Sequence, residues 1–232
     1  LVFEEHEIDH FHRFRKLRIP KEGLDCEERD DFTSDQLNLV RDIVGGSPKL
    51  KRSCLDWGVY HRRTELSRTY KAYNKGLKNI NSLLSNNINT LDDWFAQIAP
   101  LSVEISVARD KYIKKLSVIL GREPLRTIID LLGADNNLRF NFQSGWTKDV
   151  DSFDKDSIYN YLLKNKPLFL KTKHLAHGPH KASLDFFLNN KNQNFLSRGE
   201  QKTLSIIFWL LQVLLLVEEE KNPIPIHPTH WC

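Results

Sequence analysis

The sequence predicts an α/β protein that carries a long antiparallel helical hairpin. Three observations lead to this prediction. Outside residues 62–120, helical and strand patterns alternate along the chain. Within that range, two apolar stripes with helical spacing are separated by a short polar turn. Near the carboxyl end, a long apolar helix begins with a glycine-bearing turn that a serine opens, Ser197 to Lys202.

Composition limits the class of protein. The 232 residues, 40% hydrophobic and 28% charged, suffice for one core of fair size or two small ones. A surplus of 34 basic over 30 acidic residues is too small to indicate a nucleic-acid partner by itself. Cys26, Cys54 and Cys232 form no CxxC pair, which disfavours a disulfide framework and favours the cytoplasm. Because the chain starts at Leu1 and contains no methionine, we expect a piece of a longer protein.

No membrane segment is expected. The longest apolar run, Leu204 to Val217, is interrupted by Ser205 and Gln212 and is shorter than the ~20 residues that span a bilayer. It is typical of a buried helix. The first 20 residues lack the apolar centre of a signal peptide.

The first element with a clear signal is a turn at Gly45 to Pro48, and the hairpin follows it. Ser85 to Asn89 is the polar turn between two helices, and Thr90 is expected to cap the second one, with Asp92 and Asp93 in its first turn. The two apolar stripes are Leu66, Tyr70, Tyr73, Leu77, Ile80 and Leu84, then Leu91, Trp94, Ile98, Leu101, Ile105, Ala108 and Tyr112. Facing stripes of similar length predict an antiparallel hairpin, which we call the arm.

One face of the first arm helix is basic. Its cations, spaced three, four and three residues apart, are Arg68, Lys71, Lys75 and Lys78. Between His61 and Thr90 the only acidic residue is Glu65, so interleaved carboxylates are missing. Two interpretations stay open: a row of contacts to nucleic-acid phosphates, or a face that only keeps the helix soluble.

Downstream of the arm, short helices and strands alternate. The expected elements are a helix at Arg126 to Leu132, a strand through Leu138, Phe140 and Phe142, a turn at Gly145, a helix at Ser157 to Leu163, and a strand through Leu184, Phe186 and Leu188. His174, His177 and His180 are three residues apart, as in some metal sites. We expect no metal there, because Pro179 interrupts a helix and no cysteine or carboxylate supports the histidines.

The turn before the last helix has a structural and a functional interpretation. Ser197 and Glu200 fit a capping box, in which each side chain bonds the other's amide. That box leaves Gly199 unexplained, since glycine costs up to about 1 kcal/mol in a helix relative to alanine. Exposed amides, a helix dipole and a hydroxyl can instead receive a terminal phosphate. Arg198 and Lys202 would add positive charge.

Several motifs together resemble the RecF family from about Phe32 to Ile226. In order they are Gly45-Gly46-Ser47-Pro48, Leu55-Asp56-Trp57-Gly58 with His61, the arm, Gly145-Trp146, His177-Gly178-Pro179-His180-Lys181 and Leu196-Ser197-Arg198-Gly199-Glu200-Gln201-Lys202. The resemblance implies part of an ABC-type ATPase head related to SMC proteins, in which the last motif is the ABC signature.

The resemblance also implies an activity and partners. RecF is an ATP-dependent homodimer with weak DNA-stimulated ATPase activity, which binds single-stranded or gapped DNA and helps load recombinase with RecO and RecR in repair, replication and the SOS response. By resemblance, Ser197 and Gly199 touch the γ-phosphate of ATP, bound with Mg²⁺ in the intact head of the opposite subunit. The expected nucleotide contacts are Ser197, Arg198, Gly199, Gln201 and Lys202, and no catalytic residue is expected.

The resemblance suggests boundaries for the parts of the chain. They are an unassigned segment at 1–31, a head segment at 32–61, the arm at 62–120, the carboxy-terminal part of the head at 121–226 and a divergent tail at 227–232. The phosphate loop GxxxxGK[ST] occurs nowhere in the sequence, and Pro223, Pro225 and Pro228 interrupt the strand that should end in two acids. We therefore expect an incomplete ATPase, inactive alone. The alternative is a nucleotide-independent DNA-binding or interaction module, a degenerate remnant.

Overall fold

The computed structural model describes residues 43–63, 65–86, 90–123, 125–131 and 137–221. The expectations for residues 1–31, for residues 32–42 at the start of the head segment and for the tail at 227–232 lie outside these residues, as do Cys26 and Cys232.

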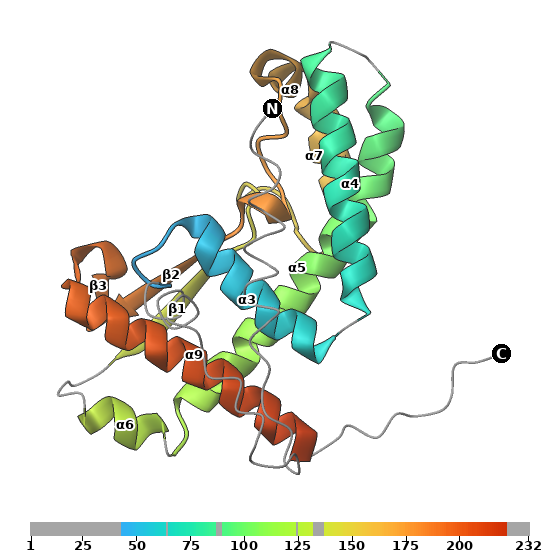
Figure 1. Cartoon of the computed structure of the whole chain (residues 1–232). Helices are drawn as coiled ribbons and strands as arrows, with labels where there is room; N and C mark the ends of the chain where they lie inside the picture. Colours follow the sequence, from blue (N-terminus) through green and yellow to red (C-terminus); the bar gives the residue numbers. More distant parts are fainter. Residues whose placement is uncertain (1–42, 64, 87–89, 124, 132–136, 222–232) are drawn as a thin grey trace, which may run out of the picture.

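The elements follow one another in a mixed order of helices and short strands (Figure 1). They are α3 (Pro48–Arg62), α4 (Leu66–Ser85), α5 (Asp92–Leu120), α6 (Leu125–Leu131), β1 (Leu138–Gln143), α7 (Lys155–Lys164), α8 (Lys166–Thr172), η1 (Pro179–Lys181), β2 (Ser183–Leu188), β3 (Lys191–Asn192), η2 (Gln193–Phe195) and α9 (Arg198–Lys221).

The predicted arm is confirmed: α4 and α5 run antiparallel, side by side (Figure 1). Tyr73, Ile80 and Leu84 of the first stripe are buried. Asp92 and Asp93 occupy the first turn of α5 as predicted, but the N-cap position is Leu91, which makes no side-chain capping bond. The prediction of Thr90 as the cap is therefore wrong by one residue, and the two aspartates supply a favourable charge at this helix end.

The long helix α5 belongs to two hydrophobic cores. Its first half packs with α4, α7 and α8, around Phe95, Ile98 and Phe169. Its second half, with Tyr112 and Leu116, packs with α3, α9 and the sheet. In Figure 1, α7 and α8 lie beside the upper part of the arm. The expected boundary at residue 120 stays a prediction. Helices α7 and α8, which follow this boundary in the sequence, pack against the arm.

The sheet is small and antiparallel, in the order β1-β2-β3. Both predicted strands exist, and Phe140 lies opposite Phe186 in their register. Phe140, Phe186 and Phe208 of α9 meet edge to face, with ring centroids 5.0–5.6 Å apart. This aromatic contact fixes α9 against the sheet.

Helix α3 was not predicted, although its amino terminus carries a strong signal. Ser47 caps the helix by accepting a hydrogen bond from the Leu50 amide at 3.2 Å, and Pro48 occupies the first turn. Serine followed by proline is a common helix start. The helix packs closely on its neighbours at Gly58, where a Cβ atom would lie 2.0 Å from the Tyr112 hydroxyl oxygen.

Helix α9 is long and apolar enough to cross a membrane by length and composition, over Arg198–Glu218. A core helix of a soluble protein meets the same criterion. Ser205 and Gln212, the polar residues of the apolar run, are fully buried, as are Phe208 and Leu211. Because α9 packs against α3, α5 and the sheet, it is a core helix of this fold.

Candidate functional site

The turn that opens α9 is a reciprocal capping box. The amide of Ser197 donates to Oε2 of Glu200 at 2.7 Å, and the amide of Glu200 donates to Oγ of Ser197 at 3.3 Å. Hydrogen bonds from the side chain and the amide of Ser197 lower the pKa of the Glu200 carboxyl below its ordinary value. The structural interpretation of this turn is therefore confirmed, and the carboxylate occupies one amide of the turn.

The same turn is open to solvent. Ser197, Arg198, Gly199 and Glu200 are all exposed, and within the described ranges a Cβ atom placed on Gly199 would meet Oγ of Ser197 alone, at 3.9 Å. Among the described residues, the amides of Arg198 and Gly199 have no hydrogen-bond acceptor. They point from the positive end of a 24-residue helix. An anion can therefore approach the backbone here.

The other predicted members of the turn differ in position. Arg198 is exposed and Lys202 is partly exposed, so both remain accessible to a ligand in solution. Gln201 instead directs its carboxamide into the protein, where Nε2 donates to the carbonyls of Gln193 and Leu196 at 2.9 and 3.3 Å. A cation that sequence reasoning missed, Lys191 in β3, lies close enough to Glu200 to help lower the pKa of that carboxyl.

The four cations of α4 are all exposed. At 1.5 Å per residue, the row from Arg68 to Lys78 is about 15 Å long. No ion pair engages Arg68, Lys71 or Lys75 within the described residues. The row does not meet the turn at Ser197: α4 lies in the arm, while α9 begins at the opposite side of the molecule, beside β3 (Figure 1).

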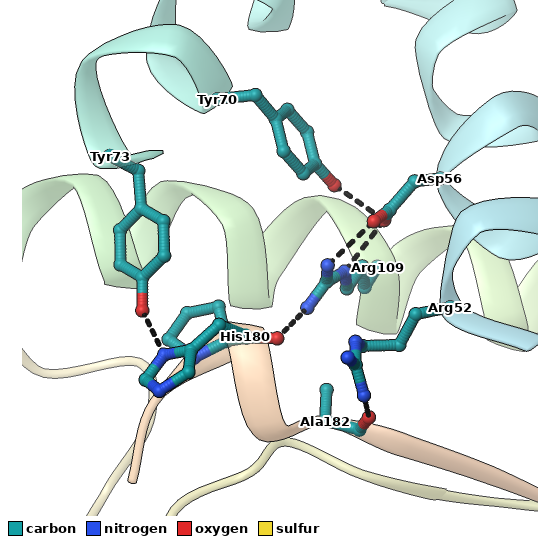
Figure 2. A network of polar contacts seen from close by, with 8 residues as sticks. Arg52, Asp56, Tyr70, Tyr73, Arg109, His180 and Ala182 are labelled. Atoms are coloured by element: carbon teal, nitrogen blue, oxygen red, sulfur yellow. Dashed lines mark hydrogen bonds and ion pairs between the residues drawn. The ribbon is translucent and has the colours of Figure 1, made fainter. Parts of the chain in front are cut away.

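A buried ion pair joins the root of the arm to α3 (Figure 2). Arg109 of α5 donates through Nε and Nη2 to the two carboxylate oxygens of Asp56, both at 2.7 Å. The hydroxyl of Tyr70 donates to Oδ1 of Asp56 at 2.7 Å. Burial opposes the charge on Arg109, but the attraction of Asp56 outweighs it and raises the pKa of the guanidinium.

The ion pair extends to the turn between residues 177 and 182 (Figure 2). Nη1 of Arg109 donates to the carbonyl of Pro179 at 2.7 Å, and Nη1 of Arg52 donates to the carbonyl of Ala182 at 2.8 Å. Sequence reasoning missed Asp56 and Arg109 as a pair. The available signal was an ionisable residue in an apolar setting, Asp56 between Leu55 and Trp57 and Arg109 next to Ala108 of the second stripe, but this signal does not identify a partner.

His180 is a structural member of this turn. Burial lowers its pKa to about 4, so the ring is neutral near pH 7. Nε2 lies 3.0 Å from the carbonyl of Leu175, which can only accept, so Nε2 carries the proton. Nδ1 then accepts from the hydroxyl of Tyr73 at 2.8 Å. The ring thus joins the turn to the arm.

The other two histidines have separate partners. Nδ1 of His177 lies 2.8 Å from the hydroxyl of Tyr161, and Nδ1 of His174 lies 2.8 Å from the carbonyl of Thr172. Within the described part of the chain, no group of three histidine, cysteine or acidic residues could hold a metal ion.

Comparison with known proteins finds similar curated sequences and similar solved structures. No protein-family model matches the chain. The DNA replication and repair protein RecF of Salmonella schwarzengrund is 29% identical over 189 residues, which cover 76% of this chain and 47% of that protein. RecF of Salmonella arizonae is 30% identical with the same coverage.

The similar solved structures are RecF proteins too. The structure of the recombination mediator protein RecF with ATP, in the RecFOR pathway, has a TM-score of 0.67 and 22% identity, and covers 79% of this chain and 50% of that chain. The chain is similar to part of a RecF protein. A second RecF structure, with ATPrS, has a TM-score of 0.66 and 21% identity.

The RecF match fits the predicted fold class, part of an α/β ABC-type ATPase head with an inserted helical arm. The chain spans about half the length of the curated RecF proteins that it matches. What the complete RecF proteins bind and do is therefore a matter of proposal for this chain.

Proposed function

We propose that this chain acts as a RecF-like, ATP-dependent DNA-binding protein of recombinational repair, replication and the SOS response, in the cytoplasm. In this proposal the turn at Ser197 contacts the γ-phosphate of an ATP, with its Mg²⁺, that another subunit presents. The subunits form an ATP-dependent homodimer on single-stranded or gapped DNA, and the complex works with RecO and RecR to load recombinase.

One observation carries the nucleotide part of this proposal. The turn is exposed, and among the described residues no group covers Gly199 and two helix amides have no acceptor. Helix termini of this kind bind phosphate through their amides and dipole. We assign phosphate contact to Ser197, Arg198, Gly199 and Lys202. The nucleotide would be presented by the partner subunit, as the resemblance to RecF implies.

The DNA part of the proposal rests on charge. Double-stranded DNA carries one negative charge per about 1.7 Å of axis, so a row about 15 Å long faces several phosphates at once. Arg68, Lys71 and Lys75 are exposed and not engaged in ion pairs within the described residues, which leaves their charges available. We assign backbone contact, without base specificity, to these three and to the exposed Lys78.

A second function is favoured by one feature of the turn. The Glu200 carboxylate already binds the Ser197 amide at 2.7 Å, and its negative charge would repel a phosphate. If it keeps that position, the chain is a nucleotide-independent module that binds DNA or a protein through the arm. The two functions differ in whether the turn must open for ATP.

Replacing Ser197 with arginine distinguishes them. The Ser197→Arg variant should lose ATP-dependent association with an intact RecF relative, because a long side chain fills the space above Gly199 and the hydroxyl is lost. The loss should be at least about a hundredfold in apparent Kd, as expected when a central contact is both removed and blocked. Analytical ultracentrifugation with and without ATP measures it.

A control variant keeps the test specific. Asn194→Arg adds the same side chain at another exposed site near the turn and should leave the association intact. Circular dichroism should show equal helix content in both variants. Association of Ser197→Arg that equals the parent's would exclude the nucleotide role and leave the nucleotide-independent module.

Charge reversal in the arm tests DNA contact. The double variant Lys71→Glu and Lys75→Glu should bind DNA about tenfold or more weakly at 100 mM salt and should reduce the slope of log K against log salt by about 2, one for each lost phosphate contact. Fluorescence anisotropy of labelled gapped DNA over a salt series measures both quantities. Lys155→Glu with Lys171→Glu, exposed cations outside the row, is the control pair. An unchanged slope would remove the row from the interface.

A further inference from the structure

Gln201 connects three segments that meet at the turn. Its Nε2 donates to the carbonyls of Gln193 and Leu196, at 2.9 and 3.3 Å. On its other side, the carboxamide faces Gly45 so closely that a Cβ atom there would lie 2.5 Å from Oε1 of Gln201. One side chain thus touches the loop before α3, the turn η2 and the start of α9.

The hydrogen bond to Leu196 has a direct effect on the turn at Ser197 to Glu200, the proposed phosphate site, which we call the phosphate turn. The carbonyl of Leu196 and the amide of Ser197 belong to one peptide unit, which is planar. Holding the carbonyl from inside the protein therefore fixes the Ser197 N–H in the opposite direction, toward Glu200 and the solvent. Gln201 orients this donor without facing the ligand itself.

The supports of Gln201 are themselves fixed. Gln193 is 3% exposed, and its Oε1 accepts from the amide of Phe186 in β2 at 2.8 Å. The hydroxyl of Ser205 accepts from the amide of Val44 at 2.8 Å and donates to the carbonyl of Gln201 at 2.8 Å. The sheet and the loop at residues 43–46 are therefore both linked to the position of Gln201.

We infer that Gln201 is a positioning residue of the phosphate turn, and that Gly45 is glycine to admit its carboxamide. This inference rests on the proposed function, because it assigns how the proposed phosphate site is held. It also replaces the expectation that Gln201 contacts the nucleotide. The loop at 43–46 becomes part of the site's support, so a displacement of that loop changes the geometry of the turn.

The test perturbs the contact from both sides. Gln201→Ala removes the carboxamide, and Gly45→Ala adds a Cβ atom that displaces it. Each should weaken ATP-dependent association with an intact RecF relative about tenfold, roughly the worth of one hydrogen bond. The double variant Gly45→Ala with Gln201→Ala should be no weaker than Gln201→Ala alone, because the added methyl then has nothing to displace. Gly121→Ala, whose Cβ has 3.8 Å of room, is the matched control.

A second readout needs no nucleotide. In the full chain, NMR should show a shifted Ser197 amide resonance and at least about tenfold faster hydrogen exchange at that amide in both single variants, at temperatures where the chain stays folded. An unchanged Ser197 amide together with weakened association in proportion to lost stability would mean a merely structural role, and would overturn the inference.

Two other outcomes are equally clear. If Gln201→Ala weakens association but Gly45→Ala does not, Gln201 contacts the nucleotide or the partner directly and the inference is wrong. If Ser197→Arg leaves association unchanged, the proposed function fails, and the Ser197 amide still decides whether Gln201 orients the turn. The failure of the inference and that of the function are thus separate results.

Discussion

Replacing Arg109 with methionine is expected to lower the free energy of unfolding by about 3–5 kcal/mol, the usual effect of removing one member of a buried ion pair. The side chain of Arg109 is only 4% exposed. Without it, the Asp56 carboxylate keeps one hydrogen bond within the described part of the chain, from Tyr70, and stays buried with an uncompensated charge. The carbonyl of Pro179 also loses its donor from Arg109 and keeps the hydrogen bond from the Ala182 amide, at 3.2 Å.

Urea denaturation of the Arg109→Met variant measures this loss, and two further variants interpret it. Arg126→Met, at an exposed site, should change the free energy of unfolding by less than about 0.5 kcal/mol. Adding Asp56→Leu to Arg109→Met should recover part of the loss, because no unpaired charge then remains. A loss below about 1 kcal/mol for Arg109→Met would mean that the pair is not desolvated as the structure shows.

Gly145→Ala is expected to destabilise the fold by about 3 kcal/mol or more, through clashes with backbone that cannot move aside. Gly145 has φ of 87°, a value that alanine rarely adopts, and its Cβ would lie 2.2 Å from the carbonyl oxygen of Gly178 and 2.6 Å from the amide nitrogen of Ala182. The amide of Gly178 donates to the carbonyl of Gly145 at 2.9 Å, so relief of the clash breaks this bond.

Gly76→Ala is the matched control for this prediction. Gly76 lies inside α4, and its Cβ would meet Ile98 at 3.8 Å, which is ordinary contact and the nearest one among the described residues. Alanine should therefore stabilise the helix by about 0.5–1 kcal/mol. Thermal unfolding followed by circular dichroism compares the two variants. A Gly145→Ala variant as stable as the parent would show that the 145 and 178 turns do not pack as described.

The capping box was predictable because its partners lie three residues apart. Ser197 and Glu200 meet in any helix that starts there, whatever surrounds it. The strands through Phe140 and Phe186 followed from alternation for the same local reason. Helix α3, which was not predicted, had a local signal too, Ser47 followed by Pro48. Its start could therefore have been predicted from the sequence.

The supports of the site were not predictable in this way. Gln201 has polar neighbours on both sides of the sequence, and nothing in their spacing says that its carboxamide turns inward to Gln193 and Leu196. Glutamine can extend toward a ligand or fold back with similar local energy. Only the return of the loop at Gly45 against α9, 156 residues away along the chain, selects the inward direction.

By itself, the sequence determined the elements whose causes are local: the periods of the arm helices, the alternation of the strands, the capped start of α9 and the basic face of α4. Tertiary structure alone decided the pairings across the chain, such as Arg109 with Asp56 and Gly145 with Gly178. Periodicity tells which face of an element is buried, but the partner that it meets depends on how distant segments return to one core.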